Sequence, residues 1–471
     1  MSRKTFKTIE ADVDAGTHDD RLYNKAFDGF RASLRNKLLP LVRHETPILA
    51  SMQKSIRTPG LDQYFVWTAN LGTHTFFMVF LPILIWFGNA ELGRNVAFLT
   101  ASGVFWSGFV KASNFDFLCL PRPMSPPVHR LTMSPSVALE YGFPSTHSTN
   151  SISVALFLIS MACEKLAPES PARLISVIAC TFYAVSVVFG RIYCGMHTVT
   201  DCIGGSILAY LVYLAQWTFK DQFNALFTSQ SYWVFMAIPI CLMLVSLHPD
   251  PMERCPCFED SVCFMGVLIG LMPGSWLCNQ TDFCYTGLSS SVLSTQIGIM
   301  GALFLLVKLV AGVACLFIWR IVCKKVCYYI LPPIYRVFNL PHRKFEIGAR
   351  TYKSLRRESI HPVPSVLDFQ SMTGNMEDHE HVGIQSAIDL REAQDQRNQL
   401  SYRGGVREDV PISTSGSDKE VFDPTSLLII EDAPLRYDVD IVTKLIVYAG
   451  IGFVAVYIVP MLFQLMSQFV V

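Results

Sequence analysis

Nine apolar segments run through this 471-residue chain and constrain its fold more than any other feature. A helix needs about 20 mostly apolar residues to cross a bilayer, and several of these segments are slightly shorter than that. The sequence therefore predicts an all-α, polytopic transmembrane helical bundle with about eight or nine spans. The segments lie near residues 72–89, 95–110, 147–163, 173–189, 202–218, 232–248, 261–277, 297–320 and 442–466.

The composition agrees with a membrane protein, because 51% of the residues are hydrophobic and only 16% are charged. Soluble globular domains carry a charged fraction closer to about 25%. The formal net charge is zero, so no excess of positive charge points to a nucleic acid. We expect a lipid environment and no nucleic-acid partner.

Three polar stretches stand at the ends of the second to fifth predicted spans. They are Lys111–Arg130 after the second span, Phe143–His147 at the start of the third, and Gly190–Asp201 between the fourth and fifth. If successive spans alternate in direction, all three stretches reach the same face of the membrane. Charged residues at span ends are costly unless they are solvated or paired, so they are candidates for function. The same-face residues of interest are Arg122, His147, Arg191, His197 and Asp201.

His197 and Asp201 are four residues apart, so on a helix their side chains lie on one face. A carboxylate that accepts a hydrogen bond from one imidazole nitrogen leaves the other nitrogen free to attack. This spacing predicts a nucleophilic histidine, His197, that is oriented by Asp201.

Anion binding is indicated by two arginines and one helix start. Guanidinium groups match phosphate oxygens because their donors are planar and paired, which suits Arg122 and Arg191 to this role. Pro144 and Ser145 begin the third span, where free backbone N–H groups form an anion site. Ordinary helix capping would explain the helix start alone, and anchoring to lipid headgroups would explain the arginines alone. Neither explains why two histidines and an aspartate lie at the same face of the membrane.

Together these residues predict phosphoryl transfer through a phosphohistidine. His197 attacks phosphorus, His147 protonates the leaving alcohol, and water then releases the phosphate. The sequence contains no cluster with metal-ligand spacing, so we expect metal-independent catalysis without a cofactor.

The motifs resemble those of the type 2 phosphatidic acid phosphatase (PAP2) superfamily. The resemblance rests on Arg122-Pro123, on Pro144-Ser145-Thr146-His147, and on Arg191 followed by His197 and Asp201. It implies a six-helix catalytic core, catalytic roles for His197, His147 and Asp201, and phosphate contacts from Arg122, Pro123, Ser145, Thr146 and Arg191. Thr146 in place of glycine, CLPRPMSPPVHR, ANLGTHTFF and GRIYCGMH resemble the branch that acts on sphingosine 1-phosphate and other long-chain base phosphates.

Two positions depart from the family pattern. Phe115 stands where the family has a phosphate-binding lysine, and Lys111, one helical turn earlier, is the candidate to replace it. Gly190 stands where a serine is usual before the second arginine, which removes one hydroxyl contact to phosphate.

The resemblance implies a phosphoric monoester hydrolase that dephosphorylates sphingosine 1-phosphate or dihydrosphingosine 1-phosphate in the endoplasmic-reticulum membrane. Asp116 and Glu140 are conceivable partners for the substrate ammonium, but solvated loop carboxylates are the simpler interpretation. Three alternatives remain. They are a broad phosphatase for phosphatidate and lysophosphatidate, a lipid phosphotransferase, and a non-enzymatic transporter or scaffold. Lys308 inside the eighth span gives the last alternative slight support, although a lysine that extends its ammonium group to the membrane surface is the ordinary explanation.

We divide the chain into a cytosolic N-terminal region (1–60), a catalytic membrane core (61–250), additional transmembrane helices (251–330), a basic and then disordered polar loop (331–440), and a C-terminal transmembrane helix (441–471). Homo-oligomerisation is open. With nine spans, the positive-inside rule puts the motifs on the cytosolic face, whereas the resemblance favours a lumenal site. One more span before residue 111, for example within 33–56, would reconcile the two.

Overall fold

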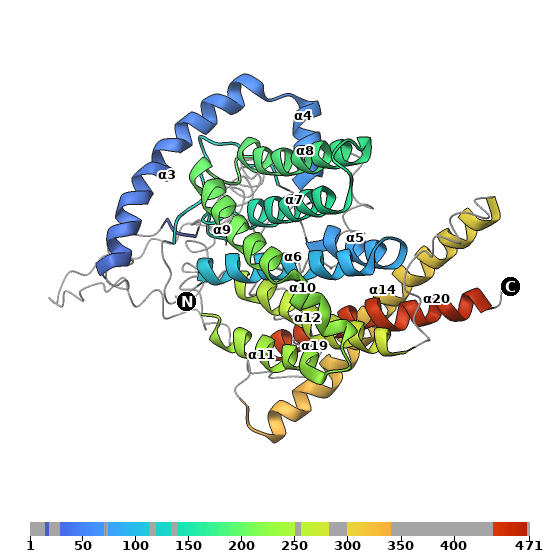
Figure 1. The fold of residues 1–471 in the computed structure, drawn as a ribbon. Helices are drawn as coiled ribbons and strands as arrows, with labels where there is room; N and C mark the ends of the chain where they lie inside the picture. The colour runs from blue at the N-terminus through green and yellow to red at the C-terminus, as the bar shows by residue number, and fades with distance from the viewer. Residues whose placement is uncertain are drawn as a thin grey trace, which may run out of the picture.

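The computed structural model describes residues 15–17, 29–69, 71, 74–112, 119–132, 140–249, 256–281, 299–340 and 437–468. Most of these residues are helical, and Figure 1 shows the majority of the helices packed together, with α3 arching outside them. Their bounds are α3 (Gly29–Ile56), α4 (Pro59–Ala69), α5 (His74–Phe87), α6 (Ala90–Ala112), α7 (Thr146–Lys165), α8 (Pro171–Tyr193), α9 (Val199–Thr218), α10 (Lys220–Thr228), the 3-10 helix η3 (Tyr232–Met236), α11 (Ala237–Leu247), α12 (Cys257–Gln280), α14 (Ile299–Val337), α19 (Val439–Phe453), the π-helical turn η4 (Val454–Ile458) and α20 (Val459–Gln468).

Each of the nine predicted apolar segments coincides with a helix or a run of helices. In the described part of the chain, five helices are long and apolar enough to cross a membrane, or six if the bent pair Lys220–Thr228 and Tyr232–Leu247 forms one span. The five are α8, α9, α12, α14 and the continuous run from α19 to α20. A multi-pass, all-helical membrane protein is therefore confirmed.

The helix α7 is less apolar than its neighbours, and it lies inside the bundle. It packs against α6, α8 and α9, and Ser148, Thr149, Asn150 and Ser151 in its first turns are fully buried. Gly205 lets α9 approach closely, since a Cβ there would lie 2.6 Å from the carbonyl oxygen of Ser145. The close contact between α7 and α9 fixes the helix ends that carry the predicted catalytic residues.

A second group of helices packs beside α6. The helices α12 and α19 run parallel and touch along their length, with Gly266 facing Leu445 and Gly270 facing Ala449. The helix α14 returns antiparallel to them, and buried Lys308 donates a hydrogen bond to Ser467 Oγ of α20 at 2.9 Å. Lys308 is thus paired within the bundle rather than snorkelling towards water.

The N-terminal helix α3 lies outside α8 and α9 and leads into α4 (Figure 1). Its Glu45 carboxylate accepts hydrogen bonds from the backbone of Val199 at 2.6 Å and of Thr200 at 3.3 Å, at the start of α9. Gln53 donates to the carbonyl oxygens of His129 and Tyr193 and accepts from the N–H of His129. The region before residue 61 therefore contacts the helix ends and the loop that carry the motifs.

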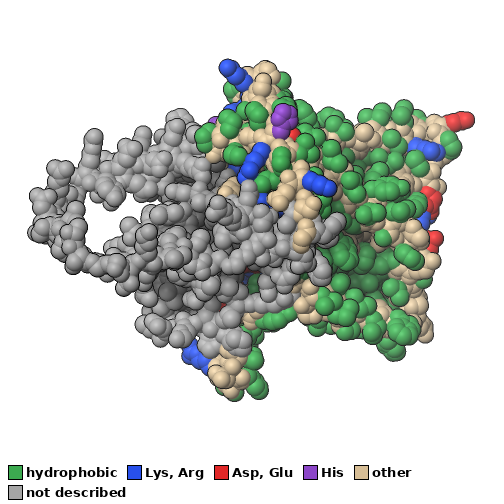
Figure 2. Space-filling model, turned by 90° about the vertical axis from the view of Figure 1, so that its left-hand side faces the viewer, with side chains coloured by type: hydrophobic (Ala, Val, Ile, Leu, Met, Phe, Trp, Pro, Cys, Tyr) green, Lys and Arg blue, Asp and Glu red, His purple; other side chains and the backbone are tan. Residues whose placement is uncertain are grey.

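The outer surface of the bundle is apolar. Six large side chains of α8 are more than a third exposed, and all six are hydrophobic: Leu174, Ile175, Ile178, Phe182, Val185 and Phe189. Figure 2, which views the molecule from the left-hand side of Figure 1, also shows a broad hydrophobic surface, with charged side chains gathered towards its margins. Such a surface is expected for helices whose surroundings are lipid.

The polar loop predicted for 331–440 falls almost entirely outside the described residues. Its first residues belong to α14, which continues to Val337. Arg336, in the predicted basic part of this region, is therefore helical.

Candidate active site

All nine predicted site residues lie at one end of the bundle formed by α6 to α9. Lys111 ends α6, Arg122 and Pro123 lie in the segment 119–132, Ser145 caps α7, Thr146 and His147 begin it, Arg191 lies in the last turn of α8, His197 lies between α8 and α9, and Asp201 lies in the first turn of α9. The charges of Arg122, Arg191, Lys111 and His147 all act on His197. The convergence predicted from the order of the spans is thus present in the fold.

His197 is buried, with only 1% of its surface exposed. Its Nδ1 lies 2.9 Å from the carbonyl oxygen of Gly142, so Nδ1 carries the proton and donates it to that oxygen. Burial, followed by the positive charges of Arg122 and Arg191, lowers the pKa of His197 well below its ordinary value. The imidazole is therefore neutral, with the lone pair on Nε2, which is the form a nucleophile needs.

Asp201 does not make the predicted hydrogen bond to His197. Its Oδ2 lies 3.7 Å from His197 Nδ1 and instead accepts a hydrogen bond from the backbone N–H of Thr198 at 2.8 Å. Thr198 Oγ1 accepts from the N–H of Asp201 in return, which completes a capping box at the start of α9. Asp201 thus fixes the turn that carries His197 and acts on the imidazole through its charge.

Arg122 is held on every side. Its Nε donates to the carbonyl oxygen of Glu140 at 3.1 Å, and its Nη2 donates to the Glu140 carboxylate. Its Nη1 donates to the carbonyl oxygen of Met196 at 2.8 Å and lies 3.4 Å from His197 Nε2. The guanidinium therefore lies directly beside the predicted nucleophilic nitrogen.

Arg191 and Lys111 are buried cations that, unlike Arg122, donate no hydrogen bond within the described residues. Arg191 is 7% exposed and Lys111 is 4% exposed. In the part of the chain that the structure describes, neither side chain donates a hydrogen bond, and Arg191 Nε is buried without a partner. Unpaired buried donors and charges are costly, so an anionic ligand between these two side chains would stabilise them.

The start of α7 joins this cluster. Ser145 is fully buried, and its Oγ accepts from the N–H of Ser148 at 3.3 Å, so the hydroxyl serves as the helix cap. Thr146 Oγ1 accepts from Ser107 Oγ of α6 at 3.1 Å, which ties α6 to α7. Both hydroxyls have structural partners, and the backbone N–H groups of the first turn are what α7 offers to an anion.

The two departures from the family pattern have different outcomes. A Cβ at Gly190 would lie 3.0 Å from the Phe65 ring of α4, so this position faces α4, and a side chain there would crowd that helix. Phe115 and Asp116 lie outside the described residues. The structure nevertheless brings Lys111 into the electrostatic environment of Arg122 and Arg191.

Two residues of this site are not among the nine predicted ones, although Glu140 was named as a conceivable partner for the substrate ammonium. Gly142 supplies the carbonyl oxygen that orients His197, and the carboxylate of Glu140 fills the fork of Arg122. The sequence interpretation of Glu140 as a solvated loop carboxylate was wrong. Both residues stand directly before the Pro-Ser-Thr-His motif, and this proximity was the available signal.

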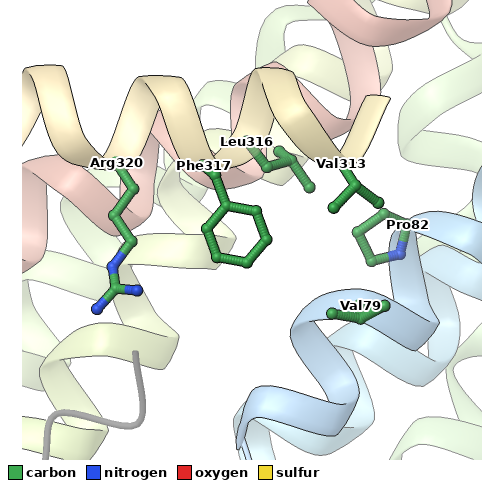
Figure 3. Close-up of a pocket in the computed structure, with 6 residues that line it drawn as sticks. All are labelled: Val79, Pro82, Val313, Leu316, Phe317 and Arg320. Atoms are coloured by element: carbon green, nitrogen blue, oxygen red, sulfur yellow. The ribbon is translucent and has the colours of Figure 1, made fainter. Parts of the chain in front are cut away.

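A separate cavity lies between α5 and α14 and is lined by Val79, Pro82, Val313, Leu316, Phe317 and Arg320 (Figure 3). None of the predicted site residues lines it, and its wall is mostly apolar. Among the described residues, no group of three or more His, Cys, Asp or Glu side chains could hold a metal ion.

Comparisons with known proteins agree with this geometry. A sequence profile of the PAP2 superfamily matches residues 94–225, which contain all nine predicted site residues. A dihydrosphingosine 1-phosphate phosphatase of Schizosaccharomyces pombe is 32% identical over 95% of this chain and 95% of its own length. A dihydrosphingosine 1-phosphate phosphatase of Saccharomyces cerevisiae is 31% identical over 68% of this chain and 76% of its own length.

A sphingosine 1-phosphate phosphatase of Homo sapiens is 29% identical over 45% of this chain and 51% of its own length. No solved structure matches the chain. With its three motifs assembled at one end of the bundle and a relative of this identity along almost its whole length, the chain belongs to the PAP2 superfamily, in the branch that contains the sphingosine 1-phosphate and dihydrosphingosine 1-phosphate phosphatases.

Proposed function

We propose that this protein dephosphorylates sphingoid long-chain base phosphates through a phosphohistidine at His197. The observation that carries the proposal is the cluster around that residue. A neutral, oriented imidazole lies beside Arg122, and two further buried cations, Arg191 and Lys111, lack hydrogen-bond partners in the described chain.

The phosphate group binds beside Arg191 and Lys111 and in front of the first turn of α7. The two cations neutralise its charge, and the backbone N–H groups of α7 add further donors. Arg122 contacts the same oxygens from the side of His197. Pro123 and Thr146 shape this binding site, and Ser145 holds the start of α7 in place.

In the first step, His197 Nε2 forms a bond to phosphorus and the bond from phosphorus to the ester oxygen breaks. His147 gives its proton to the departing alkoxide, so the lipid leaves as a neutral alcohol. In the second step, His147 takes a proton from water, the water oxygen attacks phosphorus, and the bond to Nε2 breaks. The cations stabilise the charge that develops on the phosphoryl oxygens in both steps.

The position of the site supports a lipid substrate. The helix ends that carry it lie beside α8 and α9, whose outer faces are hydrophobic, with Phe189 and Ile203 exposed close to the site residues in sequence. A phosphate headgroup can reach His197 while the hydrocarbon chain of the sphingoid base stays in the lipid. The names of the relatives support sphingosine 1-phosphate and dihydrosphingosine 1-phosphate as the substrates.

We further propose a nine-span chain in the endoplasmic-reticulum membrane, with a six-helix catalytic core inside residues 61–250. On this division, the helices after residue 250 are accessory, residues 331–440 form mainly a polar loop, and residues 441–471 form the last span. The contacts of Glu45 and Gln53 indicate that the N-terminal region supports the core.

The test is phosphate release by the full chain purified in detergent without added metal. We expect release from sphingosine 1-phosphate and dihydrosphingosine 1-phosphate, and its loss in His197→Ala. Equal turnover of phosphatidate would identify a general lipid phosphatase. Transfer of phosphate to an added acceptor lipid in place of water would identify a phosphotransferase, and no reaction with any lipid would overturn the proposal.

A further inference from the structure

Glu140 places a negative charge inside a group of cations. Its carboxylate accepts a hydrogen bond from Arg122 Nη2, and its backbone carbonyl accepts from Arg122 Nε at 3.1 Å. Arg122 is 2% exposed and the Glu140 side chain is 28% exposed, so the carboxylate is the more accessible partner of the pair. The charge of Glu140 also acts on Lys111 and Arg191.

This carboxylate poses a problem for an anionic substrate. A phosphate bound by Arg122, Lys111 and Arg191 comes close to Glu140, and the two negative charges repel each other. A site built for phosphate alone gains only the positioning of Arg122 from a carboxylate here, at the cost of this repulsion. A ligand that brings its own positive charge next to the phosphate removes the repulsion and gives Glu140 a partner.

Sphingoid base phosphates have this arrangement, because their ammonium is on the carbon next to the one that carries the phosphate. Phosphatidate, lysophosphatidate and N-acylated sphingoid phosphates lack the charge. Glu140 is therefore positioned to distinguish these classes, both by attracting an amine and by repelling a phosphate that arrives without one.

We propose that Glu140 is a specificity residue that binds the substrate ammonium when the phosphate engages Arg122. In the empty site Glu140 pairs with Arg122, and in the complex it pairs with the ammonium. The proposal rests on the proposed function, because it needs Arg122, Lys111 and Arg191 to hold the phosphate.

The experiment compares kcat/KM for dihydrosphingosine 1-phosphate with kcat/KM for its N-acetyl derivative. The chain is assayed as wild type, Glu140→Gln and Glu140→Asp, with Glu169→Gln as the control because Glu169 is an exposed carboxylate in the turn between α7 and α8. We expect wild type to prefer the free amine by about 10-fold or more, and Glu140→Gln to lose most of that preference. Glu140→Asp keeps part of it, and Glu169→Gln keeps all of it.

The outcomes separate the possible roles of Glu140. If Glu140→Gln lowers kcat/KM for both substrates by the same factor, Glu140 only positions Arg122 and the proposal is wrong. If the variant does not fold, wild type decides: a chain that hydrolyses both substrates equally well contradicts ammonium recognition, and a preference retained in part by Glu140→Asp supports it. A wild type without activity on either substrate would instead overturn the proposed function itself.

Discussion

At the scale of single residues, the site depends on how buried charges are balanced around one histidine. Arg122 is compensated by Glu140, while Arg191 and Lys111 have no hydrogen-bonded counter-charge within the described residues. This imbalance favours a bound anion, and burial of His197, followed by the neighbouring positive charges, lowers its pKa and keeps it neutral. The orientation of that histidine depends on a backbone carbonyl, so small changes in the backbone have large effects.

Gly142 provides the most sensitive test of this orientation. A Cβ at this position would lie 2.9 Å from the carbonyl oxygen of Pro121 and 3.0 Å from Asp201 Oδ2. Gly142→Ala must therefore displace the carbonyl that holds His197, and we expect kcat/KM to fall by about 100-fold or more. The control is Gly60→Ala, because a Cβ there meets no atom within 4 Å. Equal activity of the two variants in a phosphate-release assay would contradict this account of His197.

The neutral state of His197 predicts a pH dependence of stability. Its folded pKa lies below the ordinary value because of burial and then the charges of Arg122 and Arg191. Below about pH 6.5 the unfolded chain takes up a proton that the folded chain does not, so the free energy of unfolding falls by about 1.4 kcal/mol per pH unit until the folded pKa is reached. Above about pH 6.5 this contribution is constant.

The measurement is the thermal unfolding midpoint in detergent between about pH 7.5 and pH 5.5. We expect a steeper fall for wild type than for His197→Gln, which has no proton to take up at this position. The same slope in both proteins would show that His197 titrates with an ordinary pKa.

The site residues carried strong signals in the sequence because their chemistry is in their side chains. Arg122, His147, Arg191, His197 and Asp201 form a spaced pattern that is improbable in apolar spans without a function. Gly142 acts through its carbonyl group, which every residue has, and Glu140 acts through a contact that only the folded loop creates. Neither role can be deduced from residue type and spacing alone.

At the scale of elements, α3 connects the N-terminal region to the active site. Glu45 contacts the start of α9, and Gln53 bridges the loop residue His129 and the end of α8 at Tyr193. The next helix, α4, is fastened through Asp62, whose carboxylate accepts from Tyr193 Oη at 2.7 Å. Both helices thus hold the ends of spans that carry Arg191 and His197.

Gln53→Leu tests the importance of this connection. It removes two donated bonds and one accepted bond and leaves two buried carbonyls and one N–H without their partner. We expect a loss of about 2–3 kcal/mol in the free energy of unfolding, together with lower phosphatase activity. Lys54→Gln, at an exposed neighbouring position, is the control. A Gln53→Leu protein as stable and active as this control would mean that α3 does not support the site.

The nine predicted apolar segments coincide with helices, of which five, or six with the bent pair, are long and apolar enough to cross a membrane, whereas the two N-terminal helices were not predicted. Apolar length is a direct consequence of membrane thickness, so it can be recognised without the structure. The helix α3 contains Pro40 and Pro47, and its charged and apolar residues are mixed. Its helical state depends on tertiary contacts such as those of Gln53, which no local pattern records.

At the scale of the whole molecule, the N-terminal region and the active site lie on the same side of the bundle. The helix α4 descends along α8, with Tyr64 Oη 2.8 Å from Ser186 Oγ, and Tyr183 Oη donates to the carbonyl oxygen of Leu71 at 3.2 Å. The helix α5 then continues away from the site to the turn at Gly88. The helix α3 is not among the described helices apolar enough to cross a membrane and mixes charged with apolar residues, which argues against its being the additional span considered for 33–56.

The end of α14 and the start of α19 lie on this side as well. Tyr335 Oη of α14 donates to the carbonyl oxygen of Tyr437, just before α19, at 2.7 Å, and Lys444 of α19 pairs with Glu259 in the first turn of α12. Asn279 lies at the opposite end of α12. Since α3 carries several lysines and arginines, the positive-inside rule predicts that the side of the site is cytosolic and that of Asn279 lumenal, against the lumenal site that the family resemblance implies.

Protease protection in sealed microsomes tests this arrangement. We expect an epitope at the N-terminus and one inserted within 341–436 to be digested together. We expect the Asn279-Gln280-Thr281 sequon to lie on the protected side, where it would carry a glycan that is absent in Asn279→Gln. Digestion of only one epitope would contradict the shared side. Protection of both epitopes would instead support a lumenal active site.

The central claim is that His197 carries the phosphoryl group, and trapping the intermediate tests it most directly. Full-length protein is mixed with dihydrosphingosine 1-phosphate that carries a radiolabelled phosphate, denatured at once, and digested to locate the label. We expect an acid-labile, base-stable label on the peptide that contains His197, absent in His197→Gln and unchanged in His44→Gln, whose histidine is exposed on α3. Hydrolysis of the lipid with no label on the protein, or a label that persists in His197→Gln, would contradict the account.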